Sequence, residues 1–288
     1  MSGSSILQWR RIRKGVPLPI RRLLRRIWLN AFGALNDVLA PRGEMRPWKA
    51  YGRSIGGGDF ERVGSKYLER FVELGGLRPD HRVLDVGCGV GRMAVPLTSY
   101  LSNGGSYRGF DVVERSVRWC ERRIASRYDN FRFDHVDVYN EHYNPGGKLK
   151  ANDFDFPYPD EAFDFAFLIS VFTHLLPHDM KNYLSEVERV LAPGGRAFIT
   201  YTLLDDEALL SIKEGRSHLP YVHEMDGYRT VEPDEPETSV AFYESDVRAL
   251  YDDHRLHIIE PIRYGSWSGR KSDSHQDIVV AVKSSRAG

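Results

Sequence analysis

The feature that most constrains this chain is residues 82–92, RVLDVGCGVGR. An apolar, β-branched run leads to Asp85. Glycines then follow at three alternate positions, Gly87, Gly89 and Gly91. A sharp chain reversal needs positive φ, and backbone pressed against a ligand leaves no room for Cβ, so both demands select glycine. The next residues can begin a helix, whose free N–H groups favour an anionic or polar ligand. The pattern predicts a buried strand, a ligand-binding turn and a helix N-terminus.

Two nucleotide-binding patterns compete for this turn. The dinucleotide fingerprint is Gly-x-Gly-x-x-Gly, and here the third glycine comes one residue early, with Arg92 in the expected place. The spacing Asp-x-Gly-x-Gly-x-Gly, with Cys88 inside the turn, instead resembles motif I of the class I S-adenosylmethionine (SAM) dependent methyltransferases. The resemblance implies that SAM is the cofactor and that Asp85, the three glycines, Cys88 and Arg92 surround it.

A second short strand runs from Tyr107 to Asp111 and ends in a carboxylate. Asp111 lies 24 residues after Gly87, the range in which a doubly wound fold places an acid at the end of its second strand. One carboxylate can accept hydrogen bonds from both hydroxyls of a ribose. We therefore predict that Asp111, with Val112 beside it, binds the cofactor. An N-cap for the helix expected over residues 114–128 is the alternative use of the same oxygens.

A third strand is expected from Phe131 to Val138. By resemblance to the family, Asp137 would accept a hydrogen bond from the exocyclic amine of adenine, and the Val138 N–H would donate to a ring nitrogen. An aspartate that only shapes the turn is the alternative for Asp137.

Residues 163–170 form a nearly continuous apolar run, as expected of a buried central strand in a parallel sheet. Ligands of open α/β sheets bind at the carboxyl ends of the strands, so Ser170 is a predicted cofactor contact. His174 follows closely and is our candidate base, because an unperturbed histidine pKa of about 6.5 suits proton transfer near neutrality. A histidine that caps or packs against the next helix is the alternative.

The family resemblance covers residues 82–201. Its motifs follow in order: the glycine turn, Phe110-Asp111, Phe163-Asp164, and Pro193-Gly194-Gly195 before a fifth strand. Two further strand-like runs, 256–262 and 277–282, have no helical stretch between them and so predict an antiparallel hairpin. The predicted fold is α/β: a doubly wound, Rossmann-like, seven-stranded sheet, mostly parallel with an antiparallel C-terminal strand, and preceded by a helical arm.

The formal charge is zero overall but uneven, since residues 1–53 carry +10 and the remainder −10. Apolar residues stand at 20, 23, 24, 27, 28, 31, 32 and 35, which is helical spacing, and arginines stand at 21, 22, 25 and 26. This pattern resembles a helix in a membrane interface, so residues 6–35 are a candidate contact with an anionic membrane surface. A helix packed on the domain and a mitochondrial presequence are the alternatives.

We divide the chain into a basic amphipathic arm and linker, residues 1–59, and a methyltransferase domain, residues 60–288. Residues 202–243 are long for a connection and read as an insertion. Such insertions are commonly lids or substrate walls, so acceptor choice is expected there. The length of 288 residues suits one α/β domain with appendages.

Two cysteines, Cys88 and Cys120, provide neither a disulfide framework nor a metal set, which indicates a reducing cytoplasm. No apolar run is long enough to cross a bilayer, so any membrane contact is expected to be peripheral.

The expected function is in-line methyl transfer from SAM to a small molecule, a sugar or a lipid-linked intermediate, without a metal. The sequence after the fourth strand, Ser170-Val171-Phe172-Thr173, lacks the Asn/Asp-Pro-Pro-aromatic motif of nucleobase amino methyltransferases. The acidic body also argues against a nucleic-acid acceptor. The alternative is a SAM-binding scaffold or membrane-attached partner that methylates nothing.

Overall fold

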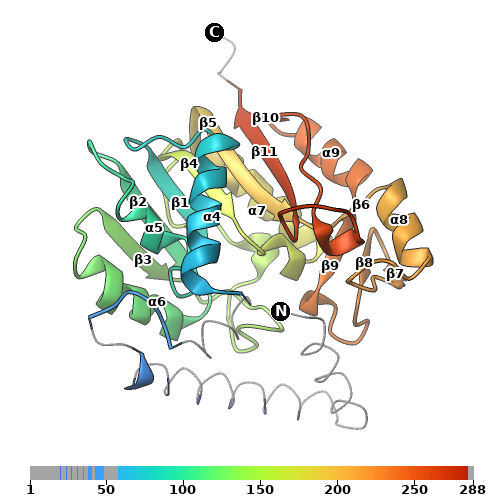
Figure 1. Cartoon of the computed structure of the whole chain (residues 1–288), viewed down its shortest axis with the longest axis horizontal. Coiled ribbons are helices and arrows are strands. Elements are labelled where there is room, and N and C mark those ends of the chain that lie inside the picture. Colours follow the sequence, from blue (N-terminus) through green and yellow to red (C-terminus); the bar gives the residue numbers. More distant parts are fainter. Residues whose placement is uncertain are drawn as a thin grey trace.

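The structure, a computed structural model, describes residues 20, 24, 27, 31, 35, 38–40, 43–48 and 58–284. A twisted sheet occupies the centre of the molecule, with helices on both faces (Figure 1). Its strand order is β10-β11-β5-β4-β1-β2-β3. The strands are β1 (Arg82–Val86), β2 (Ser106–Asp111), β3 (Phe131–His135), β4 (Phe163–Leu168), β5 (Leu191–Tyr201), β10 (Leu256–Ile258) and β11 (Asp277–Lys283).

Strands β1 to β5 pair in parallel, whereas β11 runs antiparallel to both β5 and β10. The predicted fold class is therefore confirmed: a seven-stranded, mostly parallel, Rossmann-like sheet with an antiparallel C-terminal strand. The strand β5 begins at Leu191, earlier than the predicted run, because Leu191 pairs with Phe163 before a register irregularity.

The two faces of the sheet carry separate hydrophobic clusters because successive side chains of a strand alternate in direction. Val83 faces one cluster and Leu84 the other, and both are fully buried. The first face is covered by α4 (Phe60–Glu73), α5 (Ala94–Leu97), α6 (Glu114–Cys120) and the π turn η1 (Glu121–Ala125). The second face is covered by η2 (Ala151–Asp153), η3 (Phe172–His174), α7 (Pro177–Val190) and α9 (Glu244–Asp252).

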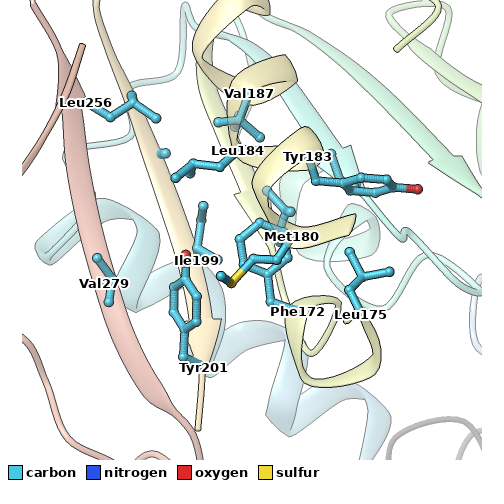
Figure 2. Close-up of a cluster of buried hydrophobic side chains, with 14 of the residues drawn as sticks. Phe172, Leu175, Met180, Tyr183, Leu184, Val187, Ile199, Tyr201, Leu256 and Val279 are labelled. Carbon is cyan, nitrogen blue, oxygen red and sulfur yellow. The ribbon is translucent and has the colours of Figure 1, made fainter. Parts of the chain in front are cut away.

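Helix α7 shows how the second face is built. Pro177 occupies its first turn, where a missing N–H costs nothing. Met180, Leu184 and Val187 then recur at helical spacing and pack toward β5 and β11 (Figure 2). This packing fixes the start of α7, and with it the turn between β4 and α7.

Residues 203–243 contribute a second, smaller sheet with the order β6-β9-β8-β7. It lies at one end of the main sheet (Figure 1). Its elements are β6 (Leu203–Leu204), α8 (Asp206–Lys213), β7 (His223–Met225), β8 (Tyr228–Thr230), η4 (Pro236–Thr238) and β9 (Val240–Tyr243). A third hydrophobic cluster includes Ala208 of α8, Ala241 of β9 and Trp267 of η5 (Ser266–Ser268), and so packs these elements together.

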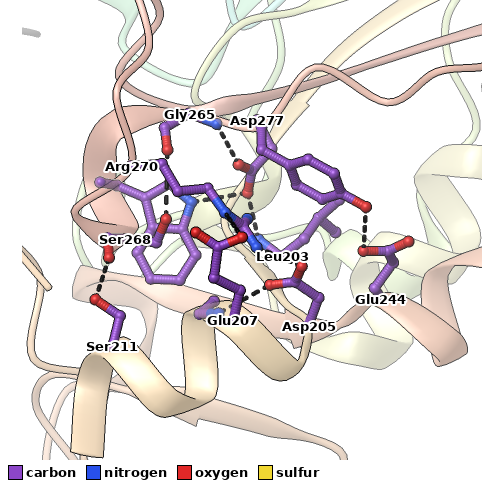
Figure 3. A network of polar contacts seen from close by, with 12 residues as sticks. Leu203, Asp205, Glu207, Ser211, Glu244, Gly265, Ser268, Arg270 and Asp277 are labelled. Atoms are coloured by element: carbon purple, nitrogen blue, oxygen red, sulfur yellow. Dashed lines mark hydrogen bonds and ion pairs between the residues drawn. The ribbon is translucent and has the colours of Figure 1, made fainter. Parts of the chain in front are cut away.

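The carboxylate of Asp277, at the start of β11, joins the two sheets (Figure 3). It is fully buried and accepts three hydrogen bonds, from the N–H groups of Leu203 and Gly265 at 2.6 Å and from the Trp267 indole at 2.8 Å. Burial raises the pKa of Asp277 to about 6, although three donors favour the charged form.

Arg270 ties the same region to α8. Its guanidinium pairs with Asp205 and Glu207 and lies 4.4 Å from the ring centroid of Tyr264. The chain at and before the start of β11 therefore contacts β6 through Asp277 and the start of α8 through Arg270 (Figure 3).

The described positions between residues 20 and 39 are helical, and their apolar side chains are exposed. The exposed fractions of Ile20, Leu24, Ile27 and Leu35 lie between 45% and 56%. Ala31 is also described and exposed, whereas Leu23, Trp28, Phe32 and the four helix arginines of the predicted amphipathic pattern lie outside the described residues. Within the described part of the chain, no helix combines the length and apolarity needed to span a membrane.

Described residues between 40 and 48, in the linker part of the arm, contact the domain. Met45 and Trp48 pack against the cluster on the first face, where Ala40 is also buried. Arg127, just after η1, donates a 2.8 Å hydrogen bond to the carbonyl of Gly43.

Replacing Asp277 should test the connection between the sheets. Asp277→Asn substitutes an NH₂ group for one acceptor oxygen and leaves at least one buried N–H without a partner. We expect unfolding free energy to fall by about 2–4 kcal/mol in urea denaturation. Asp226→Asn, in the exposed turn between β7 and β8, is the matched control and should change it by less than about 0.5 kcal/mol. Equal unfolding free energies of the two variants would contradict the role of the Asp277 carboxylate in joining the two sheets.

Candidate functional site

The turn after β1 has the predicted backbone, with φ of +77° at Gly87, +52° at Gly89 and +74° at Gly91. At Gly87 a Cβ would lie 2.6 Å from the Val171 side chain, and at Gly91 it would lie 2.5 Å from Ile124. At Gly89 it would meet nothing within 4 Å. Two glycines therefore permit close packing of the turn, whereas the third faces open space that a ligand can occupy.

Asp111 ends β2, as predicted, and lies against this turn. Its Oδ2 accepts the Gly89 N–H at 2.8 Å and its Oδ1 accepts the Val113 N–H at 2.7 Å. Burial raises the pKa of Asp111, and these two N–H groups oppose that rise. Each oxygen retains a second lone pair, so the carboxylate can still accept the two hydroxyls of a ribose. Val113 is the N-cap residue of α6, so Asp111 supports the helix start as well. Val112 packs against the cluster on the second face.

Asp85 lies beneath the turn, with an exposed fraction of 2%. Its Oδ2 accepts a 2.6 Å hydrogen bond from the Tyr107 hydroxyl, a partner that the sequence did not indicate. Burial raises the pKa of Asp85 to about 8, against the effect of this hydrogen bond. Asp85 therefore lies below the glycine turn, and its carboxyl group is more easily protonated than that of an exposed aspartate.

The two thiols and Arg92 pack around the turn. Cys88 and Cys120 are both free and buried, their Sγ atoms lie 3.9 and 3.4 Å from the Gly89 carbonyl oxygen, and burial raises the pKa of each thiol. The Arg92 guanidinium lies 5.7 Å from the Phe60 ring centroid, facing α4, and burial lowers its pKa.

The segment after β3 contains Asp137 and Val138. The side-chain amide of Asn144 lies 3.4 Å from the Asp137 carboxylate and donates to the Val138 carbonyl at 3.0 Å. Lys148 lies 3.9 Å from the same carboxylate. The Asp137 side chain is 39% exposed, which leaves it accessible to an amine donor.

The end of β4 is conformationally unusual. Ser170 has a φ of +61°, a left-handed conformation that is uncommon for a residue other than glycine and is often found at functional sites. Its N–H donates to Thr200 Oγ1, and its hydroxyl donates to Gln276 Oε1, both at 2.8 Å. The sequence did not identify Gln276, which comes from the loop before β11.

His174, the predicted base, lies in η3 at the meeting point of three segments. Its Nδ1 is 2.9 Å from the Glu237 carbonyl oxygen, and its Nε2 is 3.3 Å from the Tyr143 hydroxyl. Its ring stacks on His142, with centroids 5.7 Å apart, and its carbonyl accepts the Asn140 amide. The loop after β3, the turn after β4 and the second sheet therefore meet at this histidine.

No group of three or more metal-ligating side chains is present among the described residues.

A sequence-family profile described as a methyltransferase domain matches residues 84–199. The profile identifies residues 84–199 of this chain as a methyltransferase domain. The match spans the glycine turn, Asp111, the Ser170 turn and β5, so it confirms the predicted family and supports SAM as the cofactor that the turn accommodates.

Two curated relatives align with about half of this methyltransferase-domain chain. A tRNA N(3)-cytidine methyltransferase from Gallus gallus is 27% identical over 164 residues, which are 54% of this chain and 40% of the relative. A sterol 24-C-methyltransferase from Gibberella zeae is 30% identical over 149 residues, which are 51% of this chain and 33% of the relative. The chain thus spans less than half the length of either relative.

Among solved structures, the PH0226 protein from Pyrococcus horikoshii OT3 aligns with a TM-score of 0.54 and 19% identity. The alignment covers 82% of this chain and 99% of that chain. The similarity confirms the fold of the methyltransferase domain.

The pKa of Asp85 predicts a pH dependence. Between about pH 4 and 8 the folded state holds a proton on Asp85 that the unfolded chain has lost. The stabilisation from this proton is complete below about pH 4 and disappears as the pH rises through about 8. Asp85→Asn, which is neutral throughout, should therefore lose less stability than the wild type between about pH 5 and 8.

Urea denaturation at several pH values measures this difference. Asp129→Asn, in an exposed turn, is the control and should follow the wild-type pH profile. Parallel profiles for wild type and Asp85→Asn would show that Asp85 is ionised in the folded state at neutral pH.

Proposed function

We propose that this chain transfers the methyl group of SAM to a small molecule, a sugar or a lipid-linked intermediate. The observation that carries the proposal is the open face of the turn at Gly89 with the Asp111 carboxylate 2.8 Å from its N–H. In this arrangement, carboxylate oxygens that can accept hydrogen bonds from ribose hydroxyls lie beside main chain without a side chain. The arrangement lies within the residues that match the methyltransferase-domain profile.

Residues on three strand ends would hold the cofactor. Asp111 would accept the ribose hydroxyls, Asp137 would accept the adenine amine, and the Val138 N–H would donate to the adenine ring. Bound SAM supplies an electrophilic methyl group on a sulfonium centre. The protein must then orient an acceptor at the end of β4 and remove its proton, for which His174 is the proposed base.

Acceptor choice is assigned to the second sheet, since residues 203–243 lie beyond the family match at 84–199. The named activities of the two relatives, on a tRNA and on a sterol, differ too much to fix a class. The charge of −10 beyond residue 53 disfavours a nucleic-acid acceptor. A SAM-binding scaffold without activity is the second candidate, and it needs the same donor site.

Calorimetry and turnover test this function. SAM should bind in the micromolar range, whereas NAD should not bind. Asp111→Ala should weaken SAM binding by about 1.5–3 kcal/mol, roughly 10- to 150-fold in Kd, because a charged acceptor is lost. Asp129→Ala is the control and should bind as the wild type does. Binding of NAD without SAM would refute the proposal, and SAM binding with no transfer of labelled methyl to a cell extract would favour the scaffold.

We further propose that residues 1–59 form an arm that attaches the domain of residues 60–288 to the cytoplasmic face of an anionic membrane through residues 6–35. The support is the exposure of Ile20, Leu24 and Ile27 at helical positions, between 48% and 56%. Arginines alternate with them in the sequence at 21, 22, 25 and 26. Each basic residue near an anionic surface contributes about 1 kcal/mol.

Vesicle pelleting tests the arm. The full chain should sediment with phosphatidylserine-containing vesicles and not with phosphatidylcholine alone, and added salt should weaken the attachment. The double variant Leu24→Asp, Ile27→Asp should lose sedimentation. Val222→Asp, at an apolar position of the second sheet region that is 60% exposed, should retain it. If the arm instead packs on the domain, vesicles will have no effect and deletion of residues 1–35 will lower the melting temperature.

A further inference from the structure

The contacts of His174 define which ring nitrogen carries a proton. Nδ1 lies 2.9 Å from the Glu237 carbonyl oxygen, and a carbonyl can only accept a hydrogen bond. The neutral ring therefore holds its proton on Nδ1 and presents an unprotonated Nε2. That nitrogen is 3.3 Å from the Tyr143 hydroxyl, which must then donate to it.

This assignment orients the Tyr143 hydroxyl. With its proton directed at His174, the phenolic oxygen can accept a hydrogen bond from another group through its lone pairs. Tyr143 and His174 are both half-buried, at the carboxyl edge where the loops after β3 and β4 meet. Open α/β sheets bind their ligands at this edge.

Two contacts of Glu237 hold the pair in place from the second sheet. Its carbonyl accepts the His174 Nδ1–H, and its side-chain Oε2 accepts the Glu141 N–H at 2.5 Å. Asn140 connects the loop after β3 to the histidine, because its side-chain amide donates to the His174 carbonyl at 3.0 Å. Hydrogen bonds from Glu237 and Asn140 therefore hold the histidine and connect it to the segment that carries Tyr143.

We propose that Tyr143 is the catalytic residue that touches the acceptor, that His174 receives the proton behind it, and that the acceptor carries an O–H group. This inference rests on the proposed methyl transfer and deepens it. The acceptor O–H proton moves to the Tyr143 oxygen while the Tyr143 proton moves to His174 Nε2. The acceptor oxygen keeps the electron pair of its broken O–H bond and forms a bond to the methyl carbon, while the S–CH₃ bond breaks and its electron pair stays on sulfur, so that the demethylated cofactor leaves as a neutral thioether. The imidazolium later releases the proton to water. Glu237 is a positioning residue that fixes the histidine tautomer.

Nitrogen NMR of the full chain with ¹⁵N-labelled histidine tests the geometry without turnover. The spectrum of a His174→Gln variant assigns the resonances. We expect His174 to show a protonated Nδ1 and an unprotonated Nε2 at about neutral pH, and Tyr143→Phe to shift the Nε2 signal. An Nε2–H tautomer, or an Nε2 signal unaffected by Tyr143→Phe, would overturn the proposal.

Labelled SAM with a panel of phenols, alcohols, carboxylic acids and primary amines tests the chemistry. We expect ether or ester products, and a kcat for Tyr143→Phe that is lower by about 10²–10⁴ with the Kd for SAM within about twofold. Tyr139→Phe, at a tyrosine of the same loop that is 38% exposed, is the matched control and should keep the wild-type kcat.

Two variants of Glu237 test its role as a positioning residue. Glu237→Ala keeps the main-chain carbonyl that accepts the His174 Nδ1–H and removes the side-chain acceptor of the Glu141 N–H. It should therefore lower kcat while the Nδ1–H tautomer of His174 persists, and Glu237→Gln, which keeps an acceptor oxygen for the Glu141 N–H, should restore kcat. Methylation of amines alone, or an unchanged kcat in Tyr143→Phe, would overturn the proposal. Failure to bind SAM would refute the proposed function itself, whatever tautomer the spectrum shows.

Discussion

The hydrogen bond from the Gly89 N–H to the Asp111 carboxylate joins the turn after β1 to the end of β2, and the carboxyl edge of the sheet is arranged around it. The turn needs left-handed backbone at three positions, and that backbone directs the Gly89 N–H toward the neighbouring strand. The carboxylate needs such donors because it is nearly buried. Each group thus satisfies a requirement of the other, and the Gly89 position beside the carboxylate faces open space.

Buried carboxylates recur along this edge, and the number of donors each receives differs. Asp85 and Asp111 lie at or near the ends of parallel strands, whereas Asp277 begins β11 and reaches the same edge because β11 runs the opposite way. Asp277 accepts hydrogen bonds from three N–H groups, and its pKa rises only to about 6. Asp85 receives one phenolic donor, and its pKa rises to about 8. The additional donors and the nearby Arg270 oppose the effect of burial at Asp277, whereas the neighbouring Asp111 adds to it at Asp85, so Asp85 is the more readily protonated acid.

The sequence was sufficient for the sheet and for the residues close to the glycine turn. Residues 82–86 and 163–168 could be assigned because parallel strands covered on both faces leave long apolar runs. Asp111 could be placed because its spacing from Gly87 reflects one strand–helix–strand unit. The partners of Asp85 and His174 could not be found this way: Tyr107 lies 22 residues from Asp85, and Glu237 lies 63 residues from His174. Such contacts depend on how separate loops meet, and no local pattern records that.

The contact between Arg127 and the carbonyl of Gly43 limits how far the domain can move from its arm. Only eight peptide steps separate Leu35, the last residue of the proposed membrane contact, from Gly43, a reach of about 28 Å at full extension. If the arm rests on a bilayer, the domain cannot diffuse away or tumble freely, and one edge of it stays toward the lipid. Encounter with an acceptor held in that bilayer then becomes a lateral search in two dimensions, at an effective concentration set by the tether rather than by the bulk solution.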